Sequence, residues 1–393
     1  MNRRQALKIL STLPLATFAG NLFATPTQRK FLLVLLRGGY DSANLLVPVS
    51  SSFYYESRPN IAIPKPSSDS KSALELNNDW GLHPALRDSL YPLYKNRKLA
   101  FIPFAGTDDL SRSHFETQDS IELGLASNSK KNYESGFLNR LASVLNGSPA
   151  ISFTDQLPLI FRGNIEVPNL ALRQVGKSRI DVRQSQIITQ MYQDSKLAKS
   201  VQEGFSLRDQ VQKEIGDEMV AANRNAISSK GFALEARRIA KLMYEKFSLG
   251  FVDVGGWDTH VGEGGSTGLL ASRLDDLGQG LAAYADEMGT AWSETVVVVI
   301  SEFGRTFREN GNRGTDHGHG TTYWVLGGNV NGGRIVGEQL EVNQSTLFQN
   351  RDFPVLNDYR SVLGGILAKH FDLSLSQIGT IFPSSQAISL GLV

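Results

Sequence analysis

The chain has 393 residues, and its 40 Lys and Arg residues nearly balance its 39 Asp and Glu residues, leaving a formal net charge of +1. This balance argues against a strongly basic nucleic-acid-binding protein, and the hydrophobic content of 41% argues against a disordered chain. The lack of cysteine excludes disulfide scaffolds, thiolate zinc sites, iron–sulfur clusters and cysteine nucleophiles. No stretch reaches the ~20 uninterrupted apolar residues of a transmembrane span, so none is expected in the mature chain.

Residues 1–24 predict an export signal. Arg3 and Arg4 precede a short apolar stretch at residues 9–23, and Ala24 is a small residue at a possible cleavage point. Paired arginines at this place are typical of signals read by the twin-arginine export machinery, which carries folded proteins. We therefore expect a periplasmic or secreted protein, with an ordinary signal or an uncleaved anchor as the alternative.

Apolar runs and helical patterns alternate along the rest of the chain. Strands are predicted at residues 31–36, 99–104, 150–153, 249–254, 295–300 and 323–326. Helices are predicted at residues 84–97, 114–125, 232–247 and 268–292, and from a cap at Asp358 to His370. Strands that alternate with helices predict an α/β fold, with a mostly parallel sheet and helices on both faces.

One long segment differs from this pattern. Residues 155–247 are richer in Gln, Lys, Arg and Glu, and they predict a helical insertion. The insertion would lie within a single α/β domain that spans residues 30–393. The sequence shows no internal repeat.

Polar residues cluster where the predicted strands end. Ligands of open α/β sheets bind at the carboxyl ends of the strands. The residues at these places are Asp41, Ser113, His114, Asp258, His260, Glu302, Asp316, His317 and His319, which include four of the six histidines. His, Asp and Glu without Cys form the ligand set of a hydrolytic metal site, suited to zinc, manganese, magnesium or calcium.

Each candidate ligand also has a purely structural explanation. Asp258 and His260 are two apart, which puts both side chains on one side of an extended chain, but a turn cap and a surface histidine would look the same. Glu302 directly follows a buried strand and needs a partner there, which Arg305 alone could supply. The run of residues 316–320, with one Asp, two His and two Gly, is the most specific of these patterns.

Ser113 is the candidate nucleophile, because a hydroxyl at a helix start gains from the free backbone N–H groups and the helix dipole. The spacing of Ser113 and Glu116 is also that of a capping box, which explains both residues without catalysis. Arg112 beside it could anchor a phosphate or sulfate group. His83 could lie near the site or could close the start of a helix.

Six short motifs carry a family resemblance in a fixed order along the chain. They are residues 36–41 (Leu-Arg-Gly-Gly-Tyr-Asp), 81–86 (Gly-Leu-His-Pro-Ala-Leu), 112–116 (Arg-Ser-His-Phe-Glu), 255–260 (Gly-Gly-Trp-Asp-Thr-His), 301–306 (Ser-Glu-Phe-Gly-Arg-Thr) and 314–320 (Gly-Thr-Asp-His-Gly-His-Gly). With the twin-arginine start, they resemble the exported bacterial family catalogued as domain of unknown function 1501. That family is similar to the alkaline phosphatase and sulfatase superfamily, which implies a three-layer sandwich with metals at the strand ends.

The resemblance implies roles for individual residues. Asp41 resembles the metal carboxylate after the first strand, Ser113 the nucleophile, and His317 or His319 the last histidine ligand. Asp258 and His260 resemble the Asp and His ligands that follow a later strand. Glu302 falls where the superfamily has Asp followed by His, but Phe303 comes next here. One metal assisted by Arg305, or a second metal bound through His317, would both fit this departure.

Together these observations predict an exported, metal-dependent hydrolase of small-molecule or glycan-linked phosphate or sulfate esters. One or two divalent ions, zinc first among them, would be held by the candidate ligands Asp41, Asp258, His260, Glu302, Asp316, His317 and His319. Ser113 would attack the ester, Arg305 or Arg112 would hold the anionic oxygens, and His83 and His114 would complete the pocket. The alternative is a non-catalytic exported binding protein with the same fold, used in envelope assembly or glycan binding.

Overall fold

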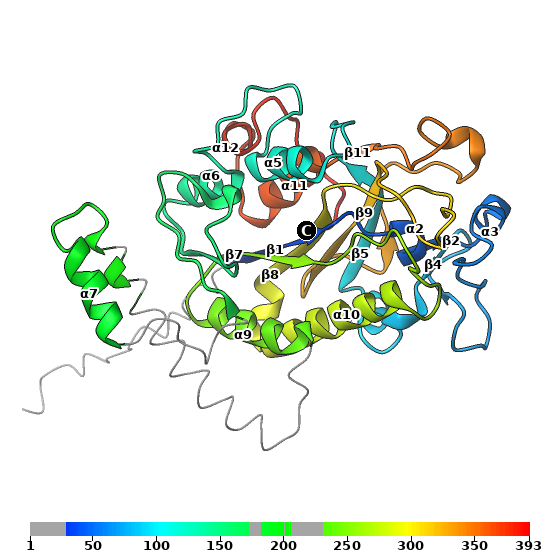
Figure 1. Ribbon diagram of the computed structural model, residues 1–393, viewed down its shortest axis with the longest axis horizontal. Coiled ribbons are helices and arrows are strands. Elements are labelled where there is room, and N and C mark those ends of the chain that lie inside the picture. Colours follow the sequence, from blue (N-terminus) through cyan, green and yellow to red (C-terminus); the bar gives the residue numbers. More distant parts are fainter. Residues whose placement is uncertain (1–28, 173–181, 200, 204, 206–230) are drawn as a thin grey trace, which may run out of the picture.

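The computed structural model describes residues 29–172, 182–199, 201–203, 205 and 231–393 (Figure 1). The predicted export signal lies outside the described residues, and so do parts of the predicted insertion at 155–247. Among the helices that the structure describes, none is long and apolar enough to cross a membrane.

A central sheet organises the described part of the chain. Its strands run in the order β10-β5-β9-β8-β1-β7-β6, and β11 also pairs with β5. The six predicted strands are all present, and their bounds, with those of the two added strands, are β1 (Lys30–Arg37), β5 (Leu99–Gly106), β6 (Ala150–Ser152), β7 (Leu249–Gly255), β8 (Thr295–Ser301), β9 (Thr321–Gly327), β10 (Arg334–Ile335) and β11 (Asn357–Asp358). A smaller antiparallel sheet contains β2 (Leu46–Pro48), β4 (Trp80–Leu82) and β3 (Leu74–Glu75).

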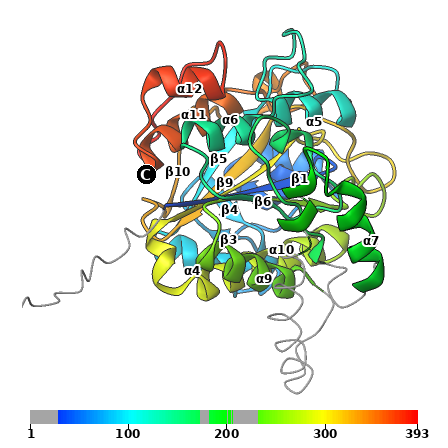
Figure 2. The same cartoon turned by 90° about the vertical axis from the view of Figure 1, so that its left-hand side faces the viewer.

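Helices cover both faces of the central sheet (Figures 1 and 2). One face carries α5 (His114–Leu123), α6 (Phe137–Val144), α11 (Tyr359–His370) and α12 (Leu375–Ile381). The other face carries α4 (Leu90–Lys95), α9 (Phe232–Glu245) and α10 (Leu269–Glu287), as Figure 2 shows. The remaining helices are α2 (Ser42–Leu45), α3 (Ser52–Ser57) and α7 (Val182–Tyr192), with 3-10 turns η1 (Pro84–Leu86), η2 (Leu159–Phe161), η4 (Gly289–Glu294) and η5 (Gln344–Thr346). The predicted three-layer α/β sandwich is confirmed.

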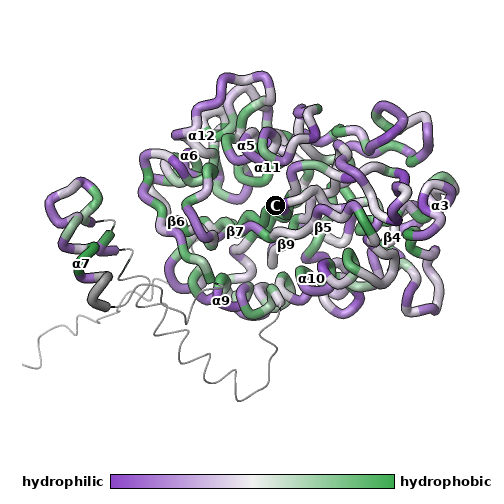
Figure 3. The backbone as a smooth tube through the Cα atoms, viewed as in Figure 1, coloured by the Kyte–Doolittle hydropathy of each residue, from purple (hydrophilic) through white to green (hydrophobic). Residues whose placement is uncertain are grey.

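Strand β1 shows why the apolar runs form this sandwich. Its side chains alternate between the two faces, so a strand covered on both sides must be apolar throughout. Leu32, Val34 and Leu36 join the core beneath α10, whereas Leu33 and Leu35 join the core beneath α5, α6 and α11. The hydrophobic colouring that runs along β7 in Figure 3 follows the same rule.

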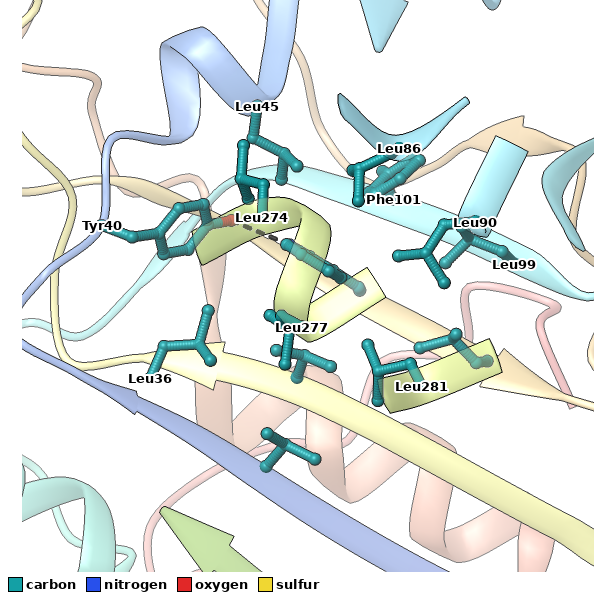
Figure 4. Close-up of a cluster of buried hydrophobic side chains, with 14 of the residues drawn as sticks. Leu36, Tyr40, Leu45, Leu86, Leu90, Leu99, Phe101, Leu274, Leu277 and Leu281 are labelled. Carbon is teal, nitrogen blue, oxygen red and sulfur yellow. Dashed lines mark hydrogen bonds between the residues drawn. The ribbon is translucent and has the colours of Figure 1, made fainter. Parts of the chain in front are cut away.

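The core beneath α10 is closed by a row of leucines. Leu274, Leu277 and Leu281 lie three and four residues apart on α10 and project toward the sheet (Figure 4). Tyr40 closes the end of this core nearest the loop after β1. Its buried hydroxyl accepts a hydrogen bond from Trp324 Nε1 at 2.9 Å and donates to the carbonyl of Thr322 at 2.5 Å.

The prediction of one continuous helix at residues 84–97 is wrong. The structure has the 3-10 turn η1, a break, and then α4 from Leu90. Pro92 explains the break, because proline has no N–H to donate and its ring clashes with the carbonyl four residues earlier. Proline is tolerated in a first turn, and the restart at Leu90 places Pro92 there.

Strand β9 departs from the parallel pattern. It pairs antiparallel with both β5 and β8, whereas β1 pairs parallel with β7 and β8. The connection from β8 to β9 therefore leaves and re-enters the sheet at one edge. That edge also holds the carboxyl ends of β1 and β7, so the long loop 302–320 turns back over the place where ligands bind in α/β sheets.

Two serine N-caps allow a matched test of helix capping. The hydroxyl of Ser374 accepts the backbone N–H of Gln377 in a complete capping box at the start of α12. Ser113 at the start of α5 makes no side-chain cap hydrogen bond, so the capping box predicted with Glu116 is not formed. We expect Ser374→Ala to lower the free energy of unfolding by about 0.5–2 kcal/mol. Ser113→Ala should change it by less than about 0.5 kcal/mol. Urea unfolding measures both, and an equal loss would contradict the difference in capping.

Candidate metal centre

Three chain segments meet at the edge of the sheet. The start of α5 brings His114, the loop after β7 brings Asp258 and His260, and the loop between β8 and β9 brings His317. Gly38, after β1, allows this close approach. Its φ is +124°, and a Cβ there would lie 2.6 Å from the backbone nitrogen of Asp258.

His317 lies at the centre of these side chains, with the other three around its Nε2. His317 Nε2 lies 3.0 Å from His114 Nε2, 3.2 Å from His260 Nε2 and 3.2 Å from Asp258 Oδ1. His260 Nε2 lies 2.9 Å from the same carboxylate oxygen. Ligand atoms of His114, Asp258 and His317 all lie within 4.8 Å of one another, a spacing that could hold a metal ion.

The other nitrogen of each imidazole faces an acceptor. His114 Nδ1 lies 2.8 Å from Glu302, His260 Nδ1 lies 3.0 Å from Asp316, and His317 Nδ1 lies 3.2 Å from the carbonyl of Arg112. Each Nδ1 can therefore donate its proton to a fixed acceptor. The neutral ring then presents only a lone pair at Nε2.

The positions of these Nε2 atoms are explained better by a bound cation than by hydrogen bonds among the imidazole rings. Three lone pairs that face one another repel unless a positive charge lies between them, and His317 Nε2 can make only one hydrogen bond while three polar atoms surround it. Tetrahedral zinc with Zn–N bonds of about 2.0–2.1 Å would put its ligands about 3.3–3.4 Å apart. The spacings of 2.9–3.2 Å around His260 and His317 are close to that value. Acceptors on the far nitrogen are also the usual outer partners of metal-bound histidines.

Glu302 is held in a fully buried position. Its Oε1 accepts hydrogen bonds from the Gly38 N–H at 2.7 Å and from Gln118 Nε2 at 2.8 Å, in addition to His114. Burial alone would raise the pKa of Glu302, but the hydrogen bonds from His114 and Gln118 outweigh it and hold the pKa below its usual value. The hydrogen bond to Glu302 in turn raises the pKa of His114. Glu302 is thus a charged acceptor that fixes the His114 ring.

Replacing this acceptor tests its role. We expect Glu302→Gln to weaken the affinity for a divalent ion about 10–100-fold, because the amide cannot act as a charged partner of His114 Nδ1. Competition with a chromophoric chelator measures the affinity. Glu338→Gln, a change of the same kind on the loop after β10, is the matched control and should leave the affinity unchanged. Equal affinities in all three proteins would contradict the role of Glu302.

Comparison with protein families identifies the chain. A family model described as "Protein of unknown function (DUF1501)" matches residues 28–382. The chain belongs to this family. A comparison with curated proteins found no match.

Solved structures resemble this DUF1501 protein only loosely. Ps i-CgsB in complex with k-i-k-neocarrahexaose has a TM-score of 0.35 and 9% identity over 80% of this chain and 69% of its own. An alkaline phosphatase superfamily protein from Vibrio parahaemolyticus has a TM-score of 0.34 and 9% identity over 76% and 60%. A mutant of TAB5 alkaline phosphatase with magnesium bound has a TM-score of 0.26 and 13% identity over 76% and 90%. Structural similarities as weak as these do not indicate a function for this chain.

Arg305 of the DUF1501 protein is fully buried behind Asp258. Its Nη1 donates to Asp258 Oδ1 at 2.6 Å, and its Nη2 donates to the carbonyl of Thr315 at 2.6 Å. Burial would raise the pKa of Asp258, but the hydrogen bond from Arg305 outweighs it and lowers the pKa. The guanidinium expected to hold a substrate anion is therefore bound to a carboxylate of the cluster.

Asp41 is bound by an arginine that sequence reasoning missed. Both oxygens of its carboxylate accept hydrogen bonds from Arg58, and both side chains are almost completely buried. Burial would raise the pKa of Asp41, but the charge of Arg58 outweighs it. Glu263, also missed, lies beside this pair, and burial together with the charge of Asp41 raises its pKa well above the usual value. No local pattern marks Arg58 or Glu263, which meet Asp41 only in the fold.

Two predicted site histidines have contacts away from the cluster. The ring of His319 packs against Phe348, and burial lowers its pKa to about 4. His83 Nδ1 accepts the N–H of Ala85 and its Nε2 faces the carbonyl of Gly265, so His83 closes the start of η1. Burial lowers the pKa of His83 to about 4 as well. The structure does not bring either ring to the converging Nε2 atoms.

Arg112 and Ser113 lie beside the cluster. The side chain of Arg112 donates to the buried Asp352 at 2.6 Å, while its carbonyl faces His317. Its φ of +53° is uncommon for a residue other than glycine. The hydroxyl of Ser113 is partly exposed and takes part in no hydrogen bond with the described part of the chain.

Proposed function

We propose that this DUF1501 protein is a metal-dependent hydrolase of phosphate or sulfate esters. The observation that carries the proposal is the convergence of three imidazole Nε2 atoms and one carboxylate, with every Nδ1 held by an acceptor. His114, His260, His317 and Asp258 would hold a divalent ion. Three nitrogens and one oxygen favour zinc, with manganese as the next choice.

The roles proposed here for several residues differ from those expected of the sequence alone. Glu302 and Asp316 orient His114 and His260 from outside, and do not bind the ion themselves. Arg305 orients Asp258. Asp41, His319 and His83 take no part in holding the ion.

Ser113 is the proposed nucleophile. It directly precedes His114 at the first turn of α5, where backbone N–H groups lack partners within the helix and favour an anion. Its hydroxyl is free because no cap hydrogen bond engages it. A bound divalent ion would lower the pKa of a nearby hydroxyl or water and polarise the ester.

Export and substrate identity belong to the same proposal. The paired arginines at the start of the sequence support passage through the twin-arginine machinery to the periplasm or the exterior. The substrate would be a small-molecule or glycan-linked anionic ester. Envelope assembly or glycan binding without catalysis is the other use that such a protein could have.

The test compares ester hydrolysis by the metal-loaded protein and by Ser113→Ala. Aryl phosphates, aryl phosphodiesters and aryl sulfates are offered after reconstitution with zinc or manganese. We expect turnover of at least one ester by the parent protein, and none by Ser113→Ala despite unchanged metal content. Ser129→Ala, on the loop after α5, is the matched control that keeps turnover. A metal-loaded parent protein that hydrolyses none of these esters would favour the binding protein.

A further inference from the structure

The first observation is a pair of arginines on one buried carboxylate. The side chain of Asp352 is fully buried, and its Oδ2 accepts hydrogen bonds from Arg112 Nη2 at 2.6 Å and from Arg351 Nη1 at 3.1 Å. The two guanidinium groups therefore lie side by side on the same oxygen. Two positive charges share one carboxylate, so at least one positive charge in this group has no opposite charge.

The second observation is that both guanidinium groups keep free donors. Within the residues that the structure describes, Nη1 of Arg112 and both Nε and Nη2 of Arg351 donate to no acceptor. Both side chains also reach the surface, with exposed fractions of 23% for Arg112 and 39% for Arg351. Free N–H groups of arginine bind the oxygens of phosphate, sulfate and carboxylate groups.

The acids on the neighbouring loops do not neutralise this pair. Each of the four other acidic residues on the loops 107–113 and 303–320 has a partner elsewhere. These pairs are Asp108 with Arg360, Asp109 with Thr117, Glu309 with Asn60 and Asp316 with His260. Arg308 adds a further cation, because it donates to two neutral oxygens of Asn350, the residue before Arg351. The surface around Arg112 and Arg351 is therefore positively charged.

Backbone pairing gives the approximate distance between these arginines and the metal centre. Residues 316–317 pair with residues 305–306, and residues 306–307 pair in turn with residues 351–352. Neighbouring paired segments lie about 4.8 Å apart, so the backbone of 351–352 lies roughly 10 Å from that of 316–317. The arginines are thus close enough to contact the same substrate molecule, but they would bind a different group from the ester held at the metal centre.

Both loops hold the arginines with uncommon backbone conformations. The φ angle is +53° at Arg112, +53° at Gln349 and +54° at Asn350, in the left-handed region that residues other than glycine rarely adopt. Gln349 Oε1 also accepts a hydrogen bond from Arg112 Nη2 at 2.9 Å, which ties the two loops together. Strained conformations of this kind concentrate at ligand-binding sites.

We propose that Arg112 and Arg351 form a second anion subsite, which binds a further sulfate, phosphate or carboxylate group of the same ester substrate. This inference rests on the proposed function and narrows its substrate class to esters with a second anionic group roughly 10 Å from the one that is cleaved. A glycan that carries several anionic substituents has this chemistry, because its charged groups are spaced along the chain.

The test compares the binding of three probes to zinc-loaded Ser113→Ala protein by calorimetry. Hexyl phosphate carries one anionic group, and 1,6-hexanediol bis(phosphate) carries two that can reach both subsites. In 1,2-ethanediol bis(phosphate) the two groups are too close together to do so, and this probe controls for charge. We expect the six-carbon bis(phosphate) to bind at least ten-fold tighter than either of the other probes.

A variant of the subsite sharpens the comparison. Arg351→Met removes one guanidinium of the pair and should abolish the advantage of the six-carbon probe without changing the zinc content. Arg97→Met is the matched control that keeps the advantage, since it removes an exposed arginine just before β5, at the opposite edge of the sheet.

The outcomes separate this inference from the hydrolase. Equal binding of the two bis(phosphates), an advantage that survives Arg351→Met, or no binding of any probe would overturn the second subsite. Equal binding by a protein that does hydrolyse esters would overturn the subsite alone. The expected advantage, found in a protein whose parent hydrolyses no ester, would support the subsite and overturn only the hydrolase.

Discussion

His317→Ala is expected to abolish tight binding of a divalent ion. Its Nε2 lies within 3.2 Å of His114, His260 and Asp258, so it is the atom that the other three surround. Removal of an outer partner costs about 10–100-fold in metal affinity, and loss of the central ligand should exceed about 100-fold. Elemental analysis after gel filtration, with calorimetric titration of zinc, measures the effect.

His319→Ala is the matched control for this variant. It removes the same kind of side chain two residues away, but its ring packs against Phe348 and does not face the cluster. We expect its metal content to equal that of the parent protein, although loss of a buried ring will lower its stability. Circular dichroism shows that both variants are folded. Equal metal loss in the two variants would contradict the assignment of the ligands.

The largest expected effect on stability comes from Arg58→Ala. This change leaves the carboxylate of Asp41 buried without its partner, and breaking a buried ion pair from one side costs about 3–5 kcal/mol. Three other groups accept hydrogen bonds from Arg58, so some loss also comes from Asn44 and the carbonyls of Thr306 and Phe307. Urea unfolding gives the change in the free energy of unfolding.

Two further variants separate the charge from the packing. The double variant Asp41→Asn/Arg58→Met should lose less than the sum of the single changes, because it leaves no unpaired charge. Arg308→Ala removes a partly exposed arginine that donates to Asn350, and should cost less than about 1 kcal/mol. Additive losses at Asp41 and Arg58 would show that the pair does not interact as the structure has it.

The fold was predictable because its strands are buried on both faces. A continuous apolar run such as residues 295–300, followed by polar residues and glycine, is typical of a strand that is buried on both faces. The antiparallel direction of β9 was not predictable, since the apolar run at 323–326 has no pattern that encodes direction. The break in the helix at residues 84–97 was encoded locally, by Pro92.

The location of the candidate site was predictable from the sequence, but the contacts of its residues were less so. Sequence order placed His114, Asp258, Glu302 and His317 at strand ends, where the structure also has them. The sequence cannot distinguish a carboxylate that binds a metal from one that holds the far nitrogen of a histidine, because both need the same residue types. Arg58 was missed because its partner Asp41 is found only once the loops have folded together.

The convergence of three chain segments on one point has a mechanical consequence. The segments that carry His114, Asp258 and His317 are attached to the sheet through their neighbouring strands. An ion bound by all three would also link these segments to one another, and a chelator would remove that link. Binding to the folded state alone stabilises it in proportion to the ion's affinity and concentration. Chelation should therefore let these segments open independently, and protease cleavage within residues 107–113 and 303–320 should be faster in the metal-free protein than in the metal-loaded one.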